Sequence, residues 1–271
     1  MTAIPESDPP DGARSGALLL AVATMAAGVF DLIWGEFEAA HQPIQAWGDR
    51  LAAQPILAYF AALWLILAGA ALLSRRTVRP GALAAAGIYL VFGLFWLPRF
   101  YTVPHILGFR VTLLLGMLAG MFTQLIVVAG ALTLYASTSP SSTFWKQTFP
   151  VVARWTFGIG ALLFSMAHLT GVQQVSQMMP PWMPLGGPFW VVLTGIAFAL
   201  AGLAILSGIL DVLAAYLLGL MLVIFELALV PLVIANPRQH IPWGSNAYSL
   251  AAAGAVLIFA ASIARRRSSS V

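Results

Sequence analysis

The sequence predicts an all-α integral membrane protein with about eight transmembrane helices, arranged as two tandem four-helix units. Two features of composition indicate this class: 61% of the 271 residues are hydrophobic, and only 8% are charged. A third is that apolar runs of about 17 to 25 residues recur along the chain, and about 20 helical residues cross a hydrocarbon core. Spanning strands would alternate polar with apolar residues, and the runs do not, so helices are predicted.

Prolines, glycines and arginines separate most of the apolar runs and set the expected ends of the helices. The sixth and seventh runs are the hardest to divide, because Ser207, Gly208 and Asp211 supply the only polar break between them. The predicted spans cover residues 15–36, 55–73, 81–97, 111–135, 150–169, 188–206, 210–235 and 249–264.

The spans divide into a predicted unit of residues 15–140 and a second of residues 141–267, flanked by tails of residues 1–14 and 268–271. The N-terminal tail carries Glu6, Asp8, Asp11 and three prolines. It lacks the basic region of a cleaved signal peptide, so we expect a disordered cytoplasmic tail. The C-terminal Arg265-Arg266-Arg267 is expected to stop at the lipid headgroups.

The distribution of basic residues predicts the orientation, because cytoplasmic loops carry an excess of Lys and Arg. With the N-terminus inside, nine basic residues lie on the inner side and four on the outer side. Both termini are therefore expected in the cytoplasm, with the protein in a bacterial inner membrane. The net charge of +4 is attributed to basic residues in the cytoplasmic loops, and no nucleic-acid binding is expected. The chain has no cysteine, which excludes disulfides, thiolate metal sites and a cysteine nucleophile.

The two halves of the chain show a repeat. Residues 67–73 and 200–206 are identical at five of seven positions, and the same offset places Pro98 on Pro231. A shift of two residues then aligns His105-Ile106 with His240-Ile241. Four spans per half is an even number, so the halves would share one orientation and form a parallel pseudo-repeat about an axis along the membrane normal.

The second half contains a series of residues at distinctive positions, namely His168, Met179-Pro180-Pro181-Trp182-Met183-Pro184, Thr194-Gly195 and Ala201-Gly202. With these residues it resembles the DoxX-like family of four-helix bacterial membrane proteins. The resemblance covers residues 151–265 and extends more faintly to the first half through Ala68-Gly69. It implies a four-helix unit and an association with membrane redox chemistry, because the family takes its name from a subunit of a quinone-reducing thiosulfate oxidoreductase. Many relatives carry an acid after the Thr-Gly pair, where this chain has residues 196–199 without one.

Two acids lie inside predicted spans, where lipid makes a charge costly unless it faces a cavity, a partner or the bundle interior. They are Asp31 in the first span and Glu226 in the seventh, and both are expected in the outer half of the membrane. We predict them as catalytic, proton-handling groups. The alternative is that each binds an arginine or a backbone group and only fixes the packing.

All four histidines are expected at or near the outer end of the bundle. His168 is a predicted catalytic residue, and His41, His105 and His240 are predicted ligand-binding residues. None has a partner three or four residues away on a helix, so no metal site is predicted. The alternative is that these side chains hydrogen-bond to loop backbone at the membrane interface.

The segment after the first span is unusually rich in polar and aromatic residues. Trp34, Glu36, His41, Gln45 and Trp47 are predicted to bind a ligand, as a lid or re-entrant turn that lines an outward-facing pocket. The alternative is an aromatic belt, with both tryptophans at the headgroups and solvated charges between them.

We predict that this pocket is lined by Asp31 together with the loop that holds His41 and Gln45. A buried Asp31 would either be neutral or need a cationic partner, and the nearest candidates by topology are Arg99, Arg110 and Arg238. Arg99 is also a predicted ligand-binding residue for an anionic group. The alternative is that these arginines pair with Glu36, Glu38 or Asp49 in the outer loops.

Two functions fit these features. The first is an enzyme or redox subunit that acts on a lipophilic small molecule, such as a quinone or an isoprenoid, in an outward-facing intramembrane pocket. The second is a non-catalytic scaffold or subunit of a membrane redox complex. A transporter is a weaker third, because the paired Gly/Pro interruptions expected at a mid-membrane substrate site are few. Expected partners are membrane lipid, the small molecule and a membrane redox protein; no cofactor is assigned.

Overall fold

Eight helices of the computed structural model are long and apolar enough to cross a membrane, which confirms an all-α polytopic membrane protein. The structure describes residues 11–43, 53–139 and 143–268. In chain order the helices are α1 (Asp11–Trp34), α2 (Gln54–Leu73), α3 (Val78–Leu94), α4 (Arg99–Leu107), α5 (Val111–Thr138), α6 (Thr143–Thr170), α7 (Val172–Ser176), α8 (Gly186–Ser207), α9 (Asp211–Ala235) and α10 (His240–Ser268).

Two of these helices begin well before their predicted starts. α6 begins at Thr143 and not at Pro150, because the buried proline is accommodated inside the helix. α10 begins at His240 and not at Ser249, because its first two turns place polar side chains toward the bundle interior, where they find partners. The short helices α4 and α7, which lie in the connections between spans, were not predicted.

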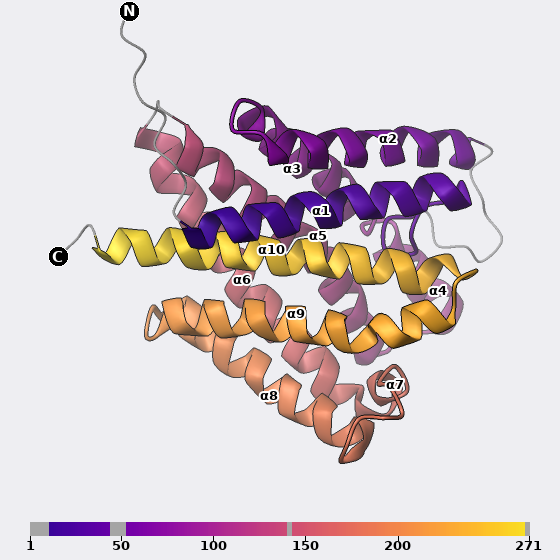
Figure 1. The fold of residues 1–271 in the computed structure, drawn as a ribbon. Coiled ribbons are helices and arrows are strands. Elements are labelled where there is room, and N and C mark those ends of the chain that lie inside the picture. Colours follow the sequence, from indigo (N-terminus) through magenta and orange to yellow (C-terminus); the bar gives the residue numbers. More distant parts are fainter. Residues whose placement is uncertain (1–10, 44–52, 140–142, 269–271) are drawn as a thin grey trace, which may run out of the picture.

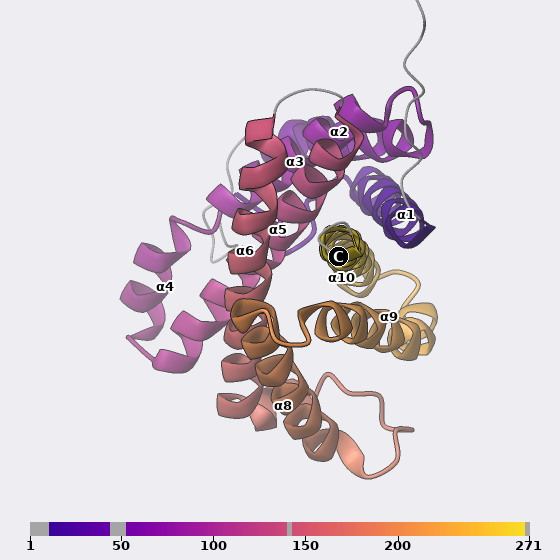
Figure 2. The ribbon, with the colours of Figure 1, turned by 90° about the vertical axis from the view of Figure 1, so that its left-hand side faces the viewer.

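Helix α10 is the centre of the bundle. It packs against α1, α9 and α5, and the view along its axis shows it enclosed between these helices (Figure 2). Its buried face is built from small residues, with Ala251, Ala255 and Gly254 all inaccessible to solvent. Small side chains allow helix backbones to approach closely where lipid offers no hydrophobic drive for association.

The neighbour relations of the helices occur in matching sets. In the first half, α1 packs on α2, α2 packs on α3, and α3 packs on α5. In the second half, α6 packs on α8, α8 packs on α9, and α9 packs on α10. Between the halves, α1 packs on α10 as α6 packs on α5. This arrangement has the form that the sequence repeat predicts, although a superposition of the two units stays a prediction.

The glycines of the two similar segments, Gly69 and Gly202, each lie against a neighbouring helix, α1 and α6 respectively. A Cβ on Gly69 would lie 2.6 Å from the carbonyl oxygen of Ala21, and a Cβ on Gly202 would lie 2.9 Å from that of Gly158. Only glycine permits these helix crossings without a backbone shift.

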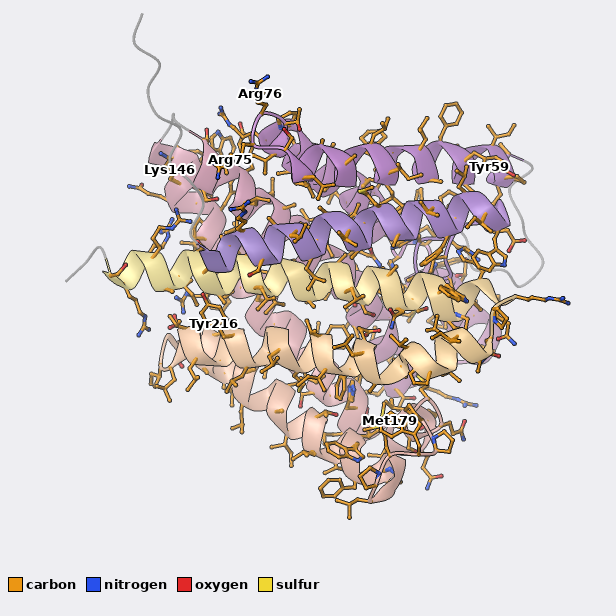
Figure 3. All side chains as sticks on the ribbon, viewed as in Figure 1. Tyr59, Arg75, Arg76, Lys146, Met179 and Tyr216 are labelled. Carbon is orange, nitrogen blue, oxygen red and sulfur yellow. The ribbon has the colours of Figure 1, made fainter. Side chains whose placement is uncertain are left out.

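Basic residues gather at the end of the bundle where the described chain begins and ends (Figures 1 and 3). Arg75, Arg76 and Lys146 lie there, and Tyr59 lies at the opposite end (Figure 3). We call these the basic end and the loop end of the bundle. Because a spanning helix places its two termini on opposite sides of a membrane, the residues at each end share one side.

Candidate functional site

A left-handed turn at Gly35 ends α1 and folds the following segment back over the loop end of the bundle. Gly35 has a φ of +65°, and its N–H donates to the carbonyl oxygen of Asp31 at 2.9 Å. A Cβ at this position would lie 2.8 Å from the hydroxyl oxygen of Tyr59 on α2. Glycine therefore satisfies both the conformation and the space.

Asp31, in the last turn of α1, is fully buried. Its Oδ1 atom lies 3.1 Å from Nε2 of His240, the first residue of α10. The same oxygen accepts a hydrogen bond from the backbone N–H of Glu38 at 3.0 Å. Oδ2 has no hydrogen-bond partner among the residues that the structure describes. Among the described residues, Asp31 is thus paired with a histidine and a backbone N–H, and not with one of the three candidate arginines.

Glu38 is a second buried acid beside this pair. Its carboxylate accepts hydrogen bonds from the backbone N–H of Ala40 at 2.6 Å and from the Ser245 hydroxyl of α10 at 2.9 Å. The close approach to α10 depends on Gly244, where a Cβ would lie 2.4 Å from Cγ of Glu38. Burial, aided by the charge of Asp31, raises the pKa of Glu38 to about 7, against the lowering effect of its two hydrogen bonds.

Arg99 and Trp96 hold the same segment from the other side. The buried Arg99 guanidinium donates to the carbonyl oxygens of Ala39 at 3.1 Å and Gln42 at 2.9 Å. The Trp96 indole donates to the carbonyl of Ala40 at 3.0 Å, and the guanidinium lies 4.0 Å from the centre of its ring. Arg99 therefore fixes backbone carbonyls and stacks on an aromatic face, as a planar cation can.

His41 lies deepest in the segment and is fully buried. Its ring stacks on Phe92 with centroids 4.1 Å apart, and the edges of Tyr89 and Tyr248 close two further sides. Neither ring nitrogen has a hydrogen-bond partner within the described part of the chain. Burial, with the nearby His240 and Arg99, lowers the pKa of His41 to about 3, so the ring is neutral at neutral pH.

Trp34 covers the outer face of His240. The two rings are nearly parallel, with centroids 5.1 Å apart, and the indole N–H donates to the carbonyl oxygen of Arg238 at 3.4 Å. His240 thus lies between an indole face and the Asp31 carboxylate. We name the group formed by Asp31, Glu38, His41 and His240 the acid–histidine cluster.

No hydrogen bond or ring contact joins this cluster to three other predicted site residues that the structure describes, Glu36, His105 and His168. Glu36 is exposed, and the exposed His105 bonds to the carbonyl of Tyr101 within α4. His168 bonds to the carbonyl of Phe164 and packs on Phe198 of α8. Gln45 and Trp47 lie outside the described residues.

Glu226 lies on the α9 side of α10. Its carboxylate accepts a hydrogen bond from the Asn246 amide at 2.9 Å, and the same amide donates to the Glu226 carbonyl oxygen at 3.0 Å. Asn246 follows Ser245, the partner of Glu38, so adjacent residues of α10 serve two different acids. Glu226 is therefore a separate polar position, linked to the cluster through α10.

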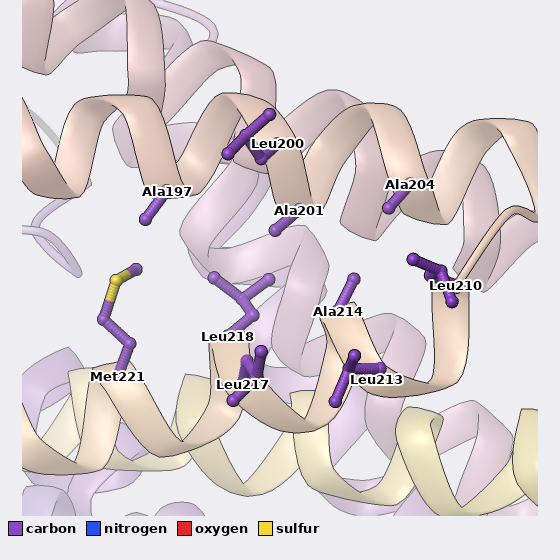
Figure 4. A pocket seen from close by; sticks show the side chains of 10 residues that line it. All are labelled: Ala197, Leu200, Ala201, Ala204, Leu210, Leu213, Ala214, Leu217, Leu218 and Met221. Carbon is purple, nitrogen blue, oxygen red and sulfur yellow. The ribbon is translucent and has the colours of Figure 1, made fainter.

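Two cavities lie away from the acid–histidine cluster. One, of about 270 Å³, is an apolar cleft between α8 and α9 (Figure 4). The other, of about 350 Å³, lies at the basic end between α5, α6 and α10. Neither is lined by a predicted site residue, so the predicted pocket beside Asp31 stays a prediction.

Several residues of the site were not predicted as site residues, namely Glu38, Trp96, Gly244, Ser245 and Asn246. Glu38 stood in the polar segment beside the predicted Glu36, but nothing in the local sequence distinguishes the buried acid from the exposed one. The small and polar residues 244–246 could have indicated that this segment contacts buried acids. Because they are hydrophilic, the segment was predicted as a loop, and the predicted start of α10 was too late.

No family model, curated protein or solved structure matches the chain. No group of three or more His, Asp or Glu side chains that could hold a metal ion occurs among the residues with described positions. The resemblance to the DoxX-like family accordingly stays a proposal.

Proposed function

We propose that this protein binds a lipophilic small molecule that carries a hydroxyl group, of the quinol or isoprenol kind, at the acid–histidine cluster. The observation that carries the proposal is the fully buried Asp31 carboxylate. Its Oδ1 lies 3.1 Å from Nε2 of His240 and accepts a hydrogen bond from the Glu38 backbone N–H, while Oδ2 has no hydrogen bond to any described residue. An unsatisfied buried carboxylate oxygen is costly, and such groups in membrane proteins are usually retained for function.

The chemistry of the cluster suits a weakly acidic ligand. Oδ2 of Asp31 accepts a hydrogen bond from a ligand hydroxyl, and the His240 imidazole lies 3.1 Å from Oδ1 on the other side of the carboxylate. Glu38, with its pKa raised to about 7, is a second group that exchanges a proton near neutral pH. Proton transfer to and from the ligand is therefore the reaction that these residues favour.

Aromatic rings around the cluster favour a planar or unsaturated ligand. His41 stacks on Phe92, and Trp34 stacks on His240. These faces are in contact with one another, so a quinone head or an isoprenoid chain would meet the ring edges and the apolar side chains around them, and the carboxylate would fix its orientation. The DoxX-like resemblance points to the same area of chemistry, since that family is associated with membrane quinone reduction.

The proposed setting is a bacterial inner membrane with both termini in the cytoplasm. The excess of Lys and Arg supports this orientation, because the basic end of the bundle then faces the cytoplasm. The acid–histidine cluster would face outward, at the depth of the outer leaflet. Two tandem four-helix units, residues 15–140 and 141–267, remain the proposed domain division.

A non-catalytic scaffold within a membrane redox complex is the second candidate. It is favoured by the pairing of the acids, since Asp31, Glu38 and Glu226 each have a polar partner on α10. Paired acids can serve to fix helix positions with no ligand at all. The two candidates differ in what the purified protein carries.

Purification in mild detergent, followed by solvent extraction, mass spectrometry and an absorbance spectrum, distinguishes the two. We expect a hydroxylated quinone or isoprenoid to co-purify with the wild type and to be lost from Asp31→Asn, when equal amounts of folded protein are compared. Glu36→Gln removes an exposed acid from the same segment and should retain the molecule. If Asp31→Asn only lowers the yield, and no lipophilic molecule is found in the wild type, the scaffold is the better account.

A further inference from the structure

The cavity at the basic end of the bundle is cationic. Its volume is about 350 Å³, and it is lined by Lys146 of α6 and by Arg265 and Arg266 of α10, with the hydroxyl side chains of Ser137 and Ser262 beside them. None of the described residues that line it is acidic. A cavity with three cationic side chains and several hydroxyl groups fits a phosphate group.

A proline fixes one of the arginines at the cavity. Pro150 lies inside α6 and has no N–H, so the carbonyl oxygen of Lys146, one turn earlier, loses its helical donor. The Arg266 guanidinium donates to that carbonyl oxygen. The arginine is thus tied to the cavity wall through the backbone of α6, while the Lys146 side chain stays exposed.

The buried acid at this end is already engaged. Both carboxylate oxygens of Asp211 are in ion pairs, Oδ2 with Arg154 at 2.6 Å and Oδ1 with Arg267 at 2.7 Å. Asp211 therefore neutralises a different pair of cations, on the α8–α9 side. Asp211 does not neutralise the positive charges of Lys146 and Arg265 at the cavity.

Aromatic side chains place the cavity at the level of the lipid headgroups. Phe144 and Trp145, in the first turn of α6, are 63% and 44% exposed. Trp145 also stacks on Phe149, with centroids 4.8 Å apart. Exposed aromatic residues at the end of a spanning helix are typical of the interface between membrane and water.

We infer that this cavity binds the phosphate of an anionic phospholipid, held by Lys146, Arg265 and Arg266 at the junction of α5, α6 and α10. Basic pockets between transmembrane helices bind acidic headgroups in this way. The site lies at the opposite end of the bundle from the acid–histidine cluster and is independent of the function proposed there. It also does not depend on which end faces the cytoplasm.

Native mass spectrometry of protein released from mixed phosphatidylglycerol and phosphatidylcholine nanodiscs tests the site. We expect retained phosphatidylglycerol in the wild type and an affinity about 30-fold lower in the double variant Arg265→Gln/Arg266→Gln. The matched control is Arg75→Gln/Arg76→Gln, which removes the same charge from the α2–α3 connection and should retain the lipid.

A second arm distinguishes a lipid from a free anion, by titrating inorganic phosphate into delipidated protein. Phosphate binding that depends on Arg265 and Arg266, without preference for phosphatidylglycerol, would support the phosphate site and overturn the lipid as its occupant. If the double variant does not fold, the exposed Lys146→Gln carries the test, with an expected weakening of about fivefold. Equal retention of the two lipids with no phosphate binding, or equal loss in the control variant, would overturn the inference.

Discussion

Asp31 and His240 join the first and last helices of the bundle, with Oδ1 of the acid 3.1 Å from Nε2 of the imidazole. Both side chains are buried, and the pair is charged only when the histidine is protonated. Because α1 and α10 also make the most extensive helix contact in the molecule, this pair lies at the edge of its main structural interface.

The first prediction concerns the energetic coupling of this pair. Asp31→Asn and His240→Gln should each lower the free energy of unfolding, because each leaves its partner buried without a counterpart. The double variant should be less destabilised than the sum of the two, by about 1–3 kcal/mol. Unfolding of the detergent-solubilised protein in a denaturant series measures all four proteins. Additivity within about 0.5 kcal/mol would show that the two side chains do not interact.

The second prediction concerns pH. Because burial raises the pKa of Glu38 from 4.5 to about 7, the folded protein holds a proton there that the unfolded chain releases. The contribution of Glu38 to the free energy of unfolding is therefore fully present below pH 4.5 and is lost as the pH rises to about 7. Asp31 of α1, His240 of α10 and Arg99 of α4 are the charged groups that act on it.

His41 contributes with the opposite sign. Its pKa is lowered from 6.5 to about 3, so its contribution is present above pH 6.5 and falls as the pH drops toward 3. The difference in unfolding midpoint between Glu38→Gln and wild type isolates the glutamate, because His41 is common to both. We expect this difference to shift in favour of Glu38→Gln as pH rises from 4.5 to 7. The exposed Glu36→Gln is the control, and a Glu38→Gln difference that is flat with pH would contradict the raised pKa.

The third prediction concerns the approach of Glu38 to α10. Gly244→Ala would place a Cβ 2.4 Å from Cγ of Glu38, so the acid or the helix must move and the Ser245 hydrogen bond is strained. We expect a loss of about 1–3 kcal/mol in the free energy of unfolding. Gly116→Ala in α5, with no atom within 4 Å of the new Cβ, is the control and should be neutral or slightly stabilising. Equal effects of the two substitutions would contradict the close packing.

Much of the fold was predictable from the sequence because lipid imposes simple constraints. Length and apolarity identify a spanning helix, and all eight were predicted. The start of α10 was missed because Gly244, Ser245 and Asn246 are hydrophilic, which is typical of a loop. In the structure these residues face acids on neighbouring segments, and this long-range pairing permits a helix there.

The candidate site was predictable residue by residue but not as an arrangement. Asp31 and His240 were each identified from their residue type and depth, yet nothing local indicates that the ends of the first and last helices meet. Glu36 was chosen over Glu38, although the turn at Gly35 exposes the first and buries the second. Such choices depend on the path of the backbone, which hydrophobicity does not encode.

The most direct test of the proposed function is ligand binding by purified protein. A short-chain ubiquinol and farnesol, both with a free hydroxyl, are titrated into wild type, Asp31→Asn and Glu36→Gln, with unfolding midpoints recorded as a folding control. We predict that the wild type binds at least one of them, that Asp31→Asn binds it at least about tenfold more weakly, and that Glu36→Gln binds it as the wild type does. Failure of the wild type to bind either molecule, or equal binding by Asp31→Asn and wild type, would contradict the proposal.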